Sequence, residues 1–326
     1  MLRISVTGTG NRTVSESCVI TLAAGDVFSV DLASGGHWYG HGFSHVQPYP
    51  LETGTVVNDQ FAVNNIQSPI WMCSAGYALL ARTTARLAVN INKDGDGKLS
   101  ITAPDEAIEI HVLRGRDLPD AHRALLAMLG GMQPAPPSAL LGDAFFCTWT
   151  QYPRCITQQR ILDFARDIRS HGYPCSTLII DDRWESCFGE LTFATKDFPD
   201  PRAMVQQLAE LDIVVWLWVT PFVNQEAATF TELSARGLLV PHRDGNGAAL
   251  FRWWGGTAGL IDVTNPAGRA WFSERLRCLK EEVGVAGFKI DGGDFKYQPS
   301  PEIAAWHNPQ GPSGYSDALL AIFDEL

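Results

Sequence analysis

The sequence predicts an all-β domain over residues 1–132, followed by an α/β domain over residues 133–326. The first part consists of short segments rich in Val, Ile, Leu and Thr, which Gly, Asn and Asp separate as in antiparallel β-structure. From Leu140 onward, strand-like and helix-like segments alternate, which is typical of parallel βα repetition. A proline-rich stretch at residues 134–137 lies between the two patterns and marks the domain boundary.

In the first domain the strand-like segments and their spacing predict an antiparallel β-sandwich. Residues 92–97 resemble the start of a calcium-binding loop, but the twelfth position is Ala103 instead of Glu and the flanks alternate like strands. We therefore expect a hairpin turn there. Residues 120–132 predict a short linker helix. The strands are expected at residues 18–23, 26–32, 77–82, 86–92 and 98–103.

A glycine-rich aromatic segment, residues 35–42, contains Trp38. It is either a corner of the sandwich or a loop that reaches a neighbouring site. Glycines around an exposed aromatic side chain suit a loop that touches a ligand, so we favour the second interpretation.

In the second domain, strands are expected at residues 145–149, 177–181, 213–219 and 286–291. A helix is expected at 157–170, and Asp200-Pro201 and Asn265-Pro266 predict the starts of two more, because Asp or Asn caps a helix whose first residue is Pro. This alternation indicates a parallel sheet, either a barrel or a doubly wound sheet.

Composition and charge narrow the classes of function. The net charge of -11 argues against nucleic acid or an anionic membrane as partner and is compatible with a neutral substrate. The seven cysteines form no CxxC pair, which excludes a zinc ribbon and gives no disulfide framework. We recognise neither a signal peptide nor an apolar run of about 18 residues that would span a membrane.

The segment VAGFKIDGGDFKY, residues 285–297, is the strongest candidate for catalysis. Asp291 is expected at the carboxyl end of a strand, where α/β barrels hold their catalytic groups. Lys289 points to the same side and would keep this carboxylate ionised, as a nucleophile requires. The alternative is a strand-end Asp that caps a loop and pairs with a surface Lys.

The other strand ends are also polar or aromatic. Asp181 and Asp182 follow the second strand, and Trp216 and Trp218 lie on the third. Carboxylates and indoles together suit an oxocarbenium-like transition state on a sugar. No nucleotide-binding motif is present, and no His lies at ligand spacing beside the aspartates, so we expect neither a cofactor nor a metal.

Each of these residues also has a structural interpretation. Asp182 and Arg183 could form an ion pair at the rim, and one of the two indoles of the third strand could be core. The tandem indoles Trp253 and Trp254 precede two glycines in an irregular insertion, which favours binding over packing.

Several motifs, in order and at similar spacing, resemble glycoside hydrolase family 31. They are IIDDRW, FPDPRAMVQQL, VVWLWVTPFVN, LIDVTNP and GFKIDGGD, between Gly142 and Pro299. FRWWGGTAGLIDVTNP, VAGFKIDGGDFKYQP and the GGHWYG segment are most similar to the myogenesis-regulating glycosidase group of that family.

The resemblance implies a retaining α-glycosidase with an N-terminal β-sandwich and a (β/α)8 TIM barrel, of which about the first four βα units are present. It implies a carbohydrate substrate, a terminal α-linked glucosyl or galactosyl residue, and Asp291 as nucleophile. The implied substrate contacts are Asp181, Trp218, Trp254, Lys289, Trp38 and Asp294, the last where the family often has Glu.

The family's acid/base is an Asp from a later part of the barrel, which we do not find before Leu326. We therefore expect the chain alone to be weakly active or inactive. One alternative is a catalytically dead glycan-binding or regulatory protein. Another is an α-galactosidase of a related barrel clan, because DDRW and KID also resemble those enzymes.

Overall fold

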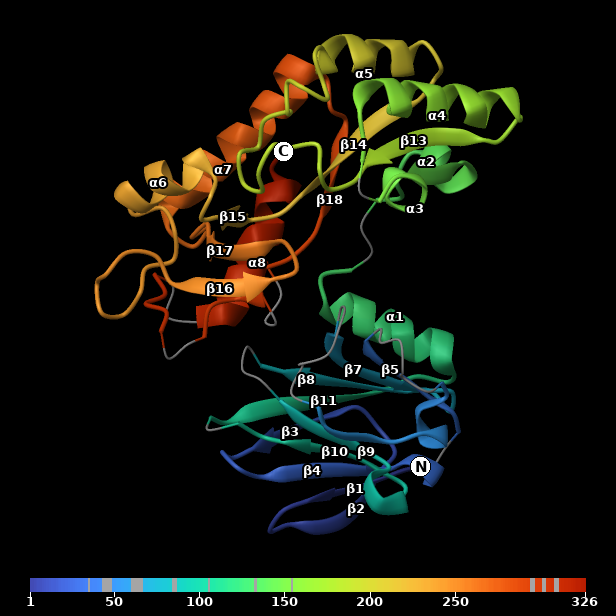
Figure 1. Ribbon diagram of the computed structural model, residues 1–326. Coiled ribbons are helices and arrows are strands. Elements are labelled where there is room, and N and C mark those ends of the chain that lie inside the picture. Colours follow the sequence, from blue (N-terminus) through green and yellow to red (C-terminus); the bar gives the residue numbers. More distant parts are fainter. Residues whose placement is uncertain are drawn as a thin grey trace. The chain divides into compact units, whose positions relative to one another are not determined.

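Figure 1 shows a computed structural model of the chain. It describes residues 1–34, 36–42, 49–59, 67–83, 87–104, 106–131, 134–153, 155–293, 297–300, 303–307 and 311–326. Two units can be separated, Met1–Pro134 and Ala135–Leu326, and their boundary lies close to the one expected after residue 132. No helix in the described ranges combines the length and apolar character that crossing a bilayer requires.

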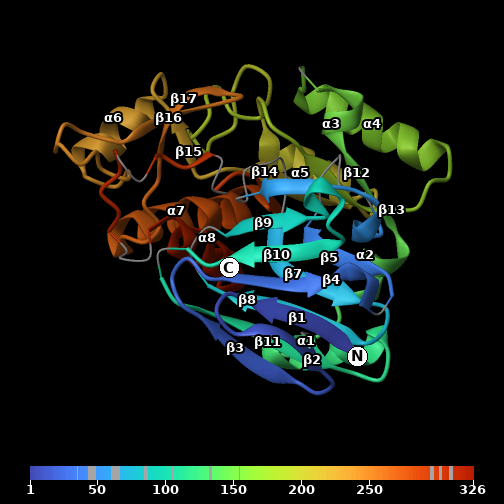
Figure 2. The same ribbon diagram turned by 90° about the horizontal axis from the view of Figure 1, so that it is seen from below.

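The first unit is built from two antiparallel sheets. Its strands are β1 (Leu2–Val6), β2 (Gly10–Val14), β3 (Cys18–Leu22), β4 (Val27–Asp31), β5 (Trp38–Gly42), β6 (Val56–Asp59), β7 (Gln67–Cys73), β8 (Tyr77–Arg82), β9 (Ala88–Ile91), β10 (Lys98–Thr102) and β11 (Ile108–Arg114). One sheet has the order β2-β1-β4-β10-β9-β6 and the other β3-β11-β8-β7-β5. Figure 2 shows the first of these sheets in front of the second.

The core of this unit lies between the two sheets. Alternate residues point inward, as the burial of β1 and β10 shows. Ile4 and Leu99 from one sheet and Leu79 and Ile110 from the other belong to the same buried cluster. The helix α1 (Leu118–Met128) packs against the five-stranded sheet through a smaller cluster that includes Leu125.

Most of the expected features of this unit are present. The five expected strands correspond to β3, β4, β8, β9 and β10. Residues 92–97 connect β9 to β10, which pair antiparallel, so the expected hairpin turn is confirmed. The expected loop at residues 35–42 is a correction: residues 38–42 form β5, which pairs with β7 from Trp38↔Cys73 onward.

The second unit combines a parallel sheet with helices and a small antiparallel sheet. Its strands are β12 (Ala144–Cys147), β13 (Cys175–Ile180), β14 (Val214–Val219), β15 (Phe222–Asn224), β16 (Leu250–Trp253), β17 (Gly256–Leu260) and β18 (Gly287–Ile290). Its helices include α2 (Ser138–Gly142), α3 (Thr148–Gln151), α4 (Gln158–Ser170), α5 (Pro201–Ala209), α6 (Ala228–Ala235), α7 (Pro266–Cys278) and α8 (Gly311–Asp324).

The parallel sheet has the order β12-β13-β14-β18, and all three pairings are parallel. The strands β15, β17 and β16 form the antiparallel sheet. The predicted helix starts are confirmed: the side chains of Thr157, Asp200 and Asn265 accept backbone N–H groups at the first turns of α4, α5 and α7. The apolar stripes of these helices are buried with the sheet in one core.

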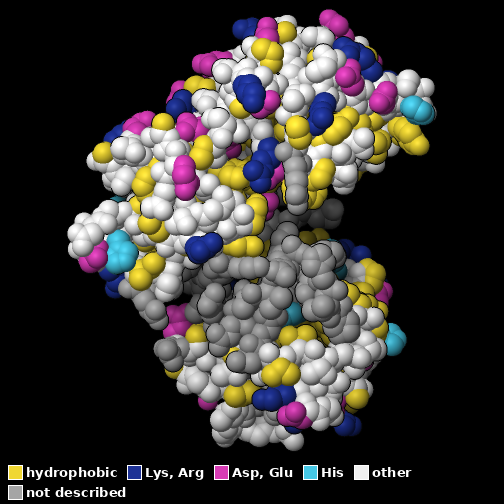
Figure 3. All heavy atoms as spheres, viewed as in Figure 1, with side chains coloured by type: hydrophobic (Ala, Val, Ile, Leu, Met, Phe, Trp, Pro, Cys, Tyr) yellow, Lys and Arg dark blue, Asp and Glu magenta, His cyan; other side chains and the backbone are white. Residues whose placement is uncertain are grey.

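The strand β12 is an edge of this sheet within the described part of the chain. Large apolar side chains around it are exposed to solvent, among them Leu141, Phe145 and Tyr173. Figure 3 shows hydrophobic side chains at the surface over the region of α2 and β13. An edge with exposed apolar side chains is a surface that another strand or chain can cover.

Candidate active site at the carboxyl ends of the parallel strands

The carboxyl ends of adjacent parallel strands bring the predicted site residues together. Asp181 directly follows β13, Trp218 lies near the end of β14, and Asp291 directly follows β18. The register pairs Trp218 with Lys289, so the last residues of β14 and β18 are level. Side chains from three segments far apart in the sequence therefore meet at one edge.

Asp291 is held by donors on both carboxylate oxygens. The indole Nε1 of Trp218 donates to Oδ2 at 2.9 Å, and the backbone N–H of Gly292 donates to Oδ1 at 2.9 Å. The Asp291 backbone itself continues the sheet by donating to Val219 O. These contacts fix the direction of the carboxylate, and hydrogen bonds to an ionised group are the stronger kind.

Gly292 is required by the close packing behind Asp291. Its φ is +80°, and a Cβ built on it would lie 2.5 Å from Cζ of Phe222. Both observations exclude a larger residue. The Gly that follows the candidate nucleophile thus lets the chain turn sharply at the strand end.

Asp181 is buried and bound to a lysine from β18, which β14 separates from β13 in the sheet. Lys289 Nζ lies 2.6 Å from Asp181 Oδ2. The Cys147 thiol donates to the same oxygen at 3.2 Å, and the Asp181 backbone N–H donates to Thr148 Oγ1. Burial lowers the pKa of Lys289, but the hydrogen bond and charge of Asp181 outweigh it and the net pKa is raised.

The partner of Lys289 differs from the expected one. The sequence predicts an ammonium that acts on Asp291; the ion pair of Lys289 is with Asp181, and the charge of Asp291 contributes less to its raised pKa. Lys289 and Asp291 lie on the same face of the chain, but they follow one another along it. The long lysine side chain can therefore reach a carboxylate on another strand more easily than the one on its own segment. Asp291 is instead oriented by Trp218.

Asp182 lies deeper than the predicted rim position. Its side chain is buried, and burial raises its pKa although Arg183 opposes the shift. Arg183 Nε lies 3.7 Å from Asp182 Oδ2, and the arginine itself is mostly exposed. The predicted pair is therefore present, with its acidic member inside.

The indoles near the site have different environments. Trp218 is 1% exposed and supports Asp291, so it offers no open stacking face. Trp253 is buried, and its Nε1 donates to Asn224 Oδ1 at 2.9 Å. Trp254, at the turn between β16 and β17, is 49% exposed and its ring lies 5.0 Å from that of Tyr297. Trp254 alone of these three has the exposure that a sugar contact needs.

Two predicted substrate contacts, Trp38 and Asp294, are not among the described residues of this site. Trp38 is buried completely in the core of the sandwich, where its Nε1 donates to Leu32 O at 3.1 Å. Its environment is that of a packing residue, because it belongs to a strand and not to an open loop. Asp294 lies outside the described residues.

Cys147 was not nominated from the sequence as a site residue. Burial, together with the neighbouring carboxylate of Asp181, raises the pKa of this thiol to about 11. A neutral thiol is a weak donor, which suits its contact with Asp181. The sequence feature that could have identified Cys147 is its position at the end of the first parallel strand. Within the described ranges no group of three or more His, Cys, Asp and Glu side chains is arranged to hold a metal ion.

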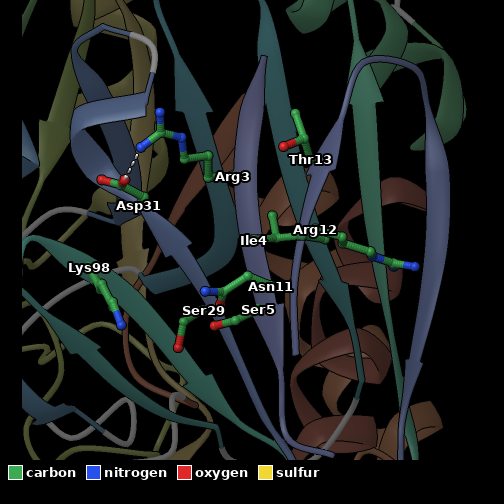
Figure 4. A pocket seen from close by; sticks show the side chains of 9 residues that line it. All are labelled: Arg3, Ile4, Ser5, Asn11, Arg12, Thr13, Ser29, Asp31 and Lys98. Atoms are coloured by element: carbon green, nitrogen blue, oxygen red, sulfur yellow. Dashed lines mark ion pairs between the residues drawn. The ribbon is translucent and has the colours of Figure 1, made fainter. Parts of the chain in front are cut away.

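A hollow on the first unit has a different lining. It lies on the outer face of the six-stranded sheet, and Figure 4 shows Ser5, Asn11 and Ser29 near one another, with Lys98 to one side. Arg3 and Asp31 form a long ion pair of 3.9 Å at its edge. Its one acidic side chain, Asp31, also accepts the backbone N–H of Ala33.

Both units match domains of known protein families. Residues 133–318 match the glycosyl hydrolases family 31 TIM-barrel domain, and residues 1–121 match the myogenesis-regulating glycosidase N-terminal domain. The myogenesis-regulating glycosidase of Mus musculus is 29% identical over 309 residues, which are 86% of this chain and 42% of the relative. The alpha-xylosidase XylQ of Lactiplantibacillus pentosus is 22% identical over 253 residues, 76% of this chain and 32% of the relative.

Solved structures share the fold. A family 31 dextranase of Flavobacterium johnsoniae superposes with a TM-score of 0.75 at 18% identity and covers 94% of this chain and 39% of its own. A xylosidase from Aspergillus niger gives a TM-score of 0.69 at 19% identity, over 96% of this chain and 46% of that chain. The chain thus spans less than half the length of these relatives. Because the family 31 domain match covers more than half of its residues, the chain belongs to the family 31 glycoside hydrolases.

Proposed function

We propose that this chain carries the nucleophile-bearing part of a retaining α-glycosidase that acts on terminal α-linked glucosyl or galactosyl residues. Asp291 attacks the anomeric carbon, and the bond from that carbon to the leaving oxygen breaks. The glycosyl-enzyme ester is then hydrolysed by water. The observation that carries the proposal is the Asp291 carboxylate, oriented by Trp218 and Gly292 at the end of β18.

The remaining site residues take supporting roles in this proposal. Lys289 and Cys147 both contact Oδ2 of Asp181, so we assign Oδ1 to the hydroxyls of the bound sugar. Trp254, half exposed, supplies an aromatic face for the sugar ring. Asp294 is retained as a proposed substrate contact on the family resemblance alone.

The leaving oxygen needs a proton, and retaining enzymes place the second carboxyl group about 5–5.5 Å from the first. Of the described acids near Asp291, Asp181 is engaged by Lys289, and Asp182 is the partner of Arg183. Following the family resemblance, in which the acid/base comes from a later part of the barrel, we propose that it is not one of these described acids and expect the chain alone to turn over glycosides slowly or not at all. The exposed apolar edge at β12 supports further strands covering the sheet.

The test is hydrolysis of nitrophenyl α-glucoside and nitrophenyl α-galactoside by the chain, by Asp291→Asn and by Asp182→Asn. We expect no sustained turnover by the unmodified chain, because nitrophenolate can leave without a general acid but hydrolysis of the glycosyl ester still needs a general base. Clear turnover that is lost in both variants would contradict the assignment of the acid/base and identify Asp182 as the proton donor. Turnover that survives in Asp291→Asn would contradict the nucleophile.

A catalytically dead glycan-binding protein is the second candidate, and the exposed Trp254 is the observation that favours it. A glycosyl fluoride that carries a second fluorine on the sugar ring, which slows the reaction, distinguishes a glycosidase from a binding protein. Fluoride leaves without a proton, so an intact nucleophile forms the ester even when no acid is present. A dead binding protein retains the sugar reversibly and forms no ester.

A further inference from the structure

A buried acid, Glu185, lies in the loop after β13 and is unused by the chemistry above. It is 8% exposed, and its Oε2 accepts the backbone N–H of Gly189 at 3.1 Å and of Leu191 at 2.6 Å. The backbone of the loop from residue 185 to residue 191 therefore folds back onto the side chain of Glu185. A buried carboxyl group that binds two backbone donors fixes the path of the chain between them.

This loop, residues 185–191, is pressed against the strand β15. The backbone N–H of Asn224 donates to Phe188 O at 3.0 Å. Gly189 has φ +96°, and a Cβ on it would lie 2.7 Å from Cα of Val223. The loop backbone touches the strand so closely that a change in its path displaces Phe188.

Phe188 carries the loop's contact with the candidate active site. Its ring centroid lies 5.7 Å from that of Trp218 and 4.8 Å from that of Trp253. Trp218 is the residue whose indole donates to Asp291. A continuous set of contacts thus runs from Glu185 through the loop and Phe188 to the indole that orients the candidate nucleophile.

We propose that Glu185 is a positioning residue for Asp291, which acts by holding the 185–191 loop so that Phe188 packs against Trp218. This inference rests on the proposed role of Asp291 as nucleophile. In this proposal Glu185 does not contact the substrate and keeps the Trp218 indole in place through the loop.

The protonation state of Glu185 makes the proposal measurable. Both donors use Oε2, so Oε1 can carry a proton while the loop contacts remain. Burial raises the pKa of Glu185 from 4.5 to about 8, and hydrogen bonds from the loop backbone only partly oppose it. Glu190, whose own carboxylate is fixed by Ala228 N and Thr229 Oγ1, adds to the increase. The other charged or titratable groups near the loop are Arg183, Cys187 and Glu226.

The direction of the pH effect follows from linkage. The folded chain binds the Glu185 proton more tightly than the unfolded chain does, so the stabilisation is full below about pH 4.5 and is lost as the pH rises through about 8. Above that pH a buried carboxylate faces Glu190, and the loop is expected to loosen.

The experiment measures the rate of ester formation with the glycosyl fluoride described above, from pH 6 to pH 9.5, by mass spectrometry of the intact chain. Tryptophan fluorescence is recorded on the same samples. In the unmodified chain we expect both signals to change with a midpoint near pH 8, with about a tenfold fall in rate between pH 7 and pH 9, because the protonated fraction falls by that ratio. Glu185→Gln keeps an acceptor and cannot ionise, so its rate should stay level over this range.

The matched control is Glu210→Gln, the same change at an exposed position, which should keep the transition of the unmodified chain. Phe188→Leu should lower the rate at all pH values and reduce the fluorescence change. A transition near pH 8 that persists in Glu185→Gln would overturn the proposal, as would a level rate in the unmodified chain. A third outcome separates the two proposals. If neither the unmodified chain nor any variant forms the ester, but the fluorescence transition is present in the unmodified chain and absent in Glu185→Gln, the role of Asp291 is overturned and the loop contact of Glu185 is supported.

Discussion

Two buried tryptophans, one in each unit, donate their indole N–H to different kinds of acceptor. Trp38 in the sandwich donates to the backbone carbonyl of Leu32, and Trp218 in the α/β unit donates to the carboxylate of Asp291. Both side chains are almost completely buried. Burial and residue type therefore do not separate an indole of the core from one that contacts the proposed nucleophile, whereas the acceptor does.

The largest difference in stability is expected between truncating the buried Trp38 and truncating the half-exposed Trp254. Trp38→Ala leaves a cavity in the sandwich and should lower the free energy of unfolding by about 3–5 kcal/mol. Trp254→Ala removes a half-exposed ring and should change it by less than about 1 kcal/mol, while glycan binding is lost. Urea unfolding and calorimetric titration with an α-linked disaccharide measure the two quantities. Glycan affinity unchanged in Trp254→Ala would contradict the binding role of this indole.

A more conservative change tests the two N–H contacts directly. Trp218→Phe removes a hydrogen bond to a charged group, worth about 1.5–3 kcal/mol, so ester formation with the glycosyl fluoride should slow about 10- to 100-fold. Trp38→Phe should leave that rate unchanged.

Trp71 offers a matched control in the same comparison. Its buried Nε1 has no hydrogen-bond partner in the described part of the chain, so Trp71→Phe loses no hydrogen bond and should leave the labelling rate unchanged. Equal labelling rates for Trp218→Phe and the unmodified chain would show that the indole does not orient Asp291.

An effect smaller than that of Trp38→Ala is expected at Lys289, whose side chain is 39% exposed. Lys289→Met leaves Asp181 buried without its ion partner and should cost about 2 kcal/mol, less than for a fully buried pair. The pKa of Lys289 is raised above 10.5, so the stabilisation is complete below pH 10.5 and is lost as the pH rises through the higher folded value.

Urea unfolding at pH 7 and at strongly alkaline pH checks this prediction. The difference between the unmodified chain and Lys289→Met should shrink at alkaline pH. The exposed Lys196→Met is the control and should change little at either pH. A constant difference between the unmodified chain and Lys289→Met at both pH values would contradict the ion pair as its source.

The parts of this molecule that depend on local signals could be predicted from the sequence. Thr157 and Asp200 cap helices because their side chains reach backbone N–H groups a few residues away. Asp181 and Asp291 could be placed together because both follow parallel strands, and parallel strands end at a common edge.

The parts that depend on neighbouring strands could not be predicted. The partner of Lys289 is set by the spacing between β13, β14 and β18, which no single segment encodes. Trp38 was expected in a loop because glycines surround it, whereas pairing with β7 places it in the core. The loop contacts of Glu185 likewise appear only when residues 185–191 fold against β15.

Locating the glycosyl ester tests the central claim most directly. The chain is treated with the glycosyl fluoride, digested with a protease, and the labelled peptide is sequenced by mass spectrometry, with Asp291→Asn as control. The account predicts one fluoroglycosyl group on Asp291, and none on the Asn variant. An ester on Asp181 or Asp182, or no ester at any carboxylate of the unmodified chain, would contradict it.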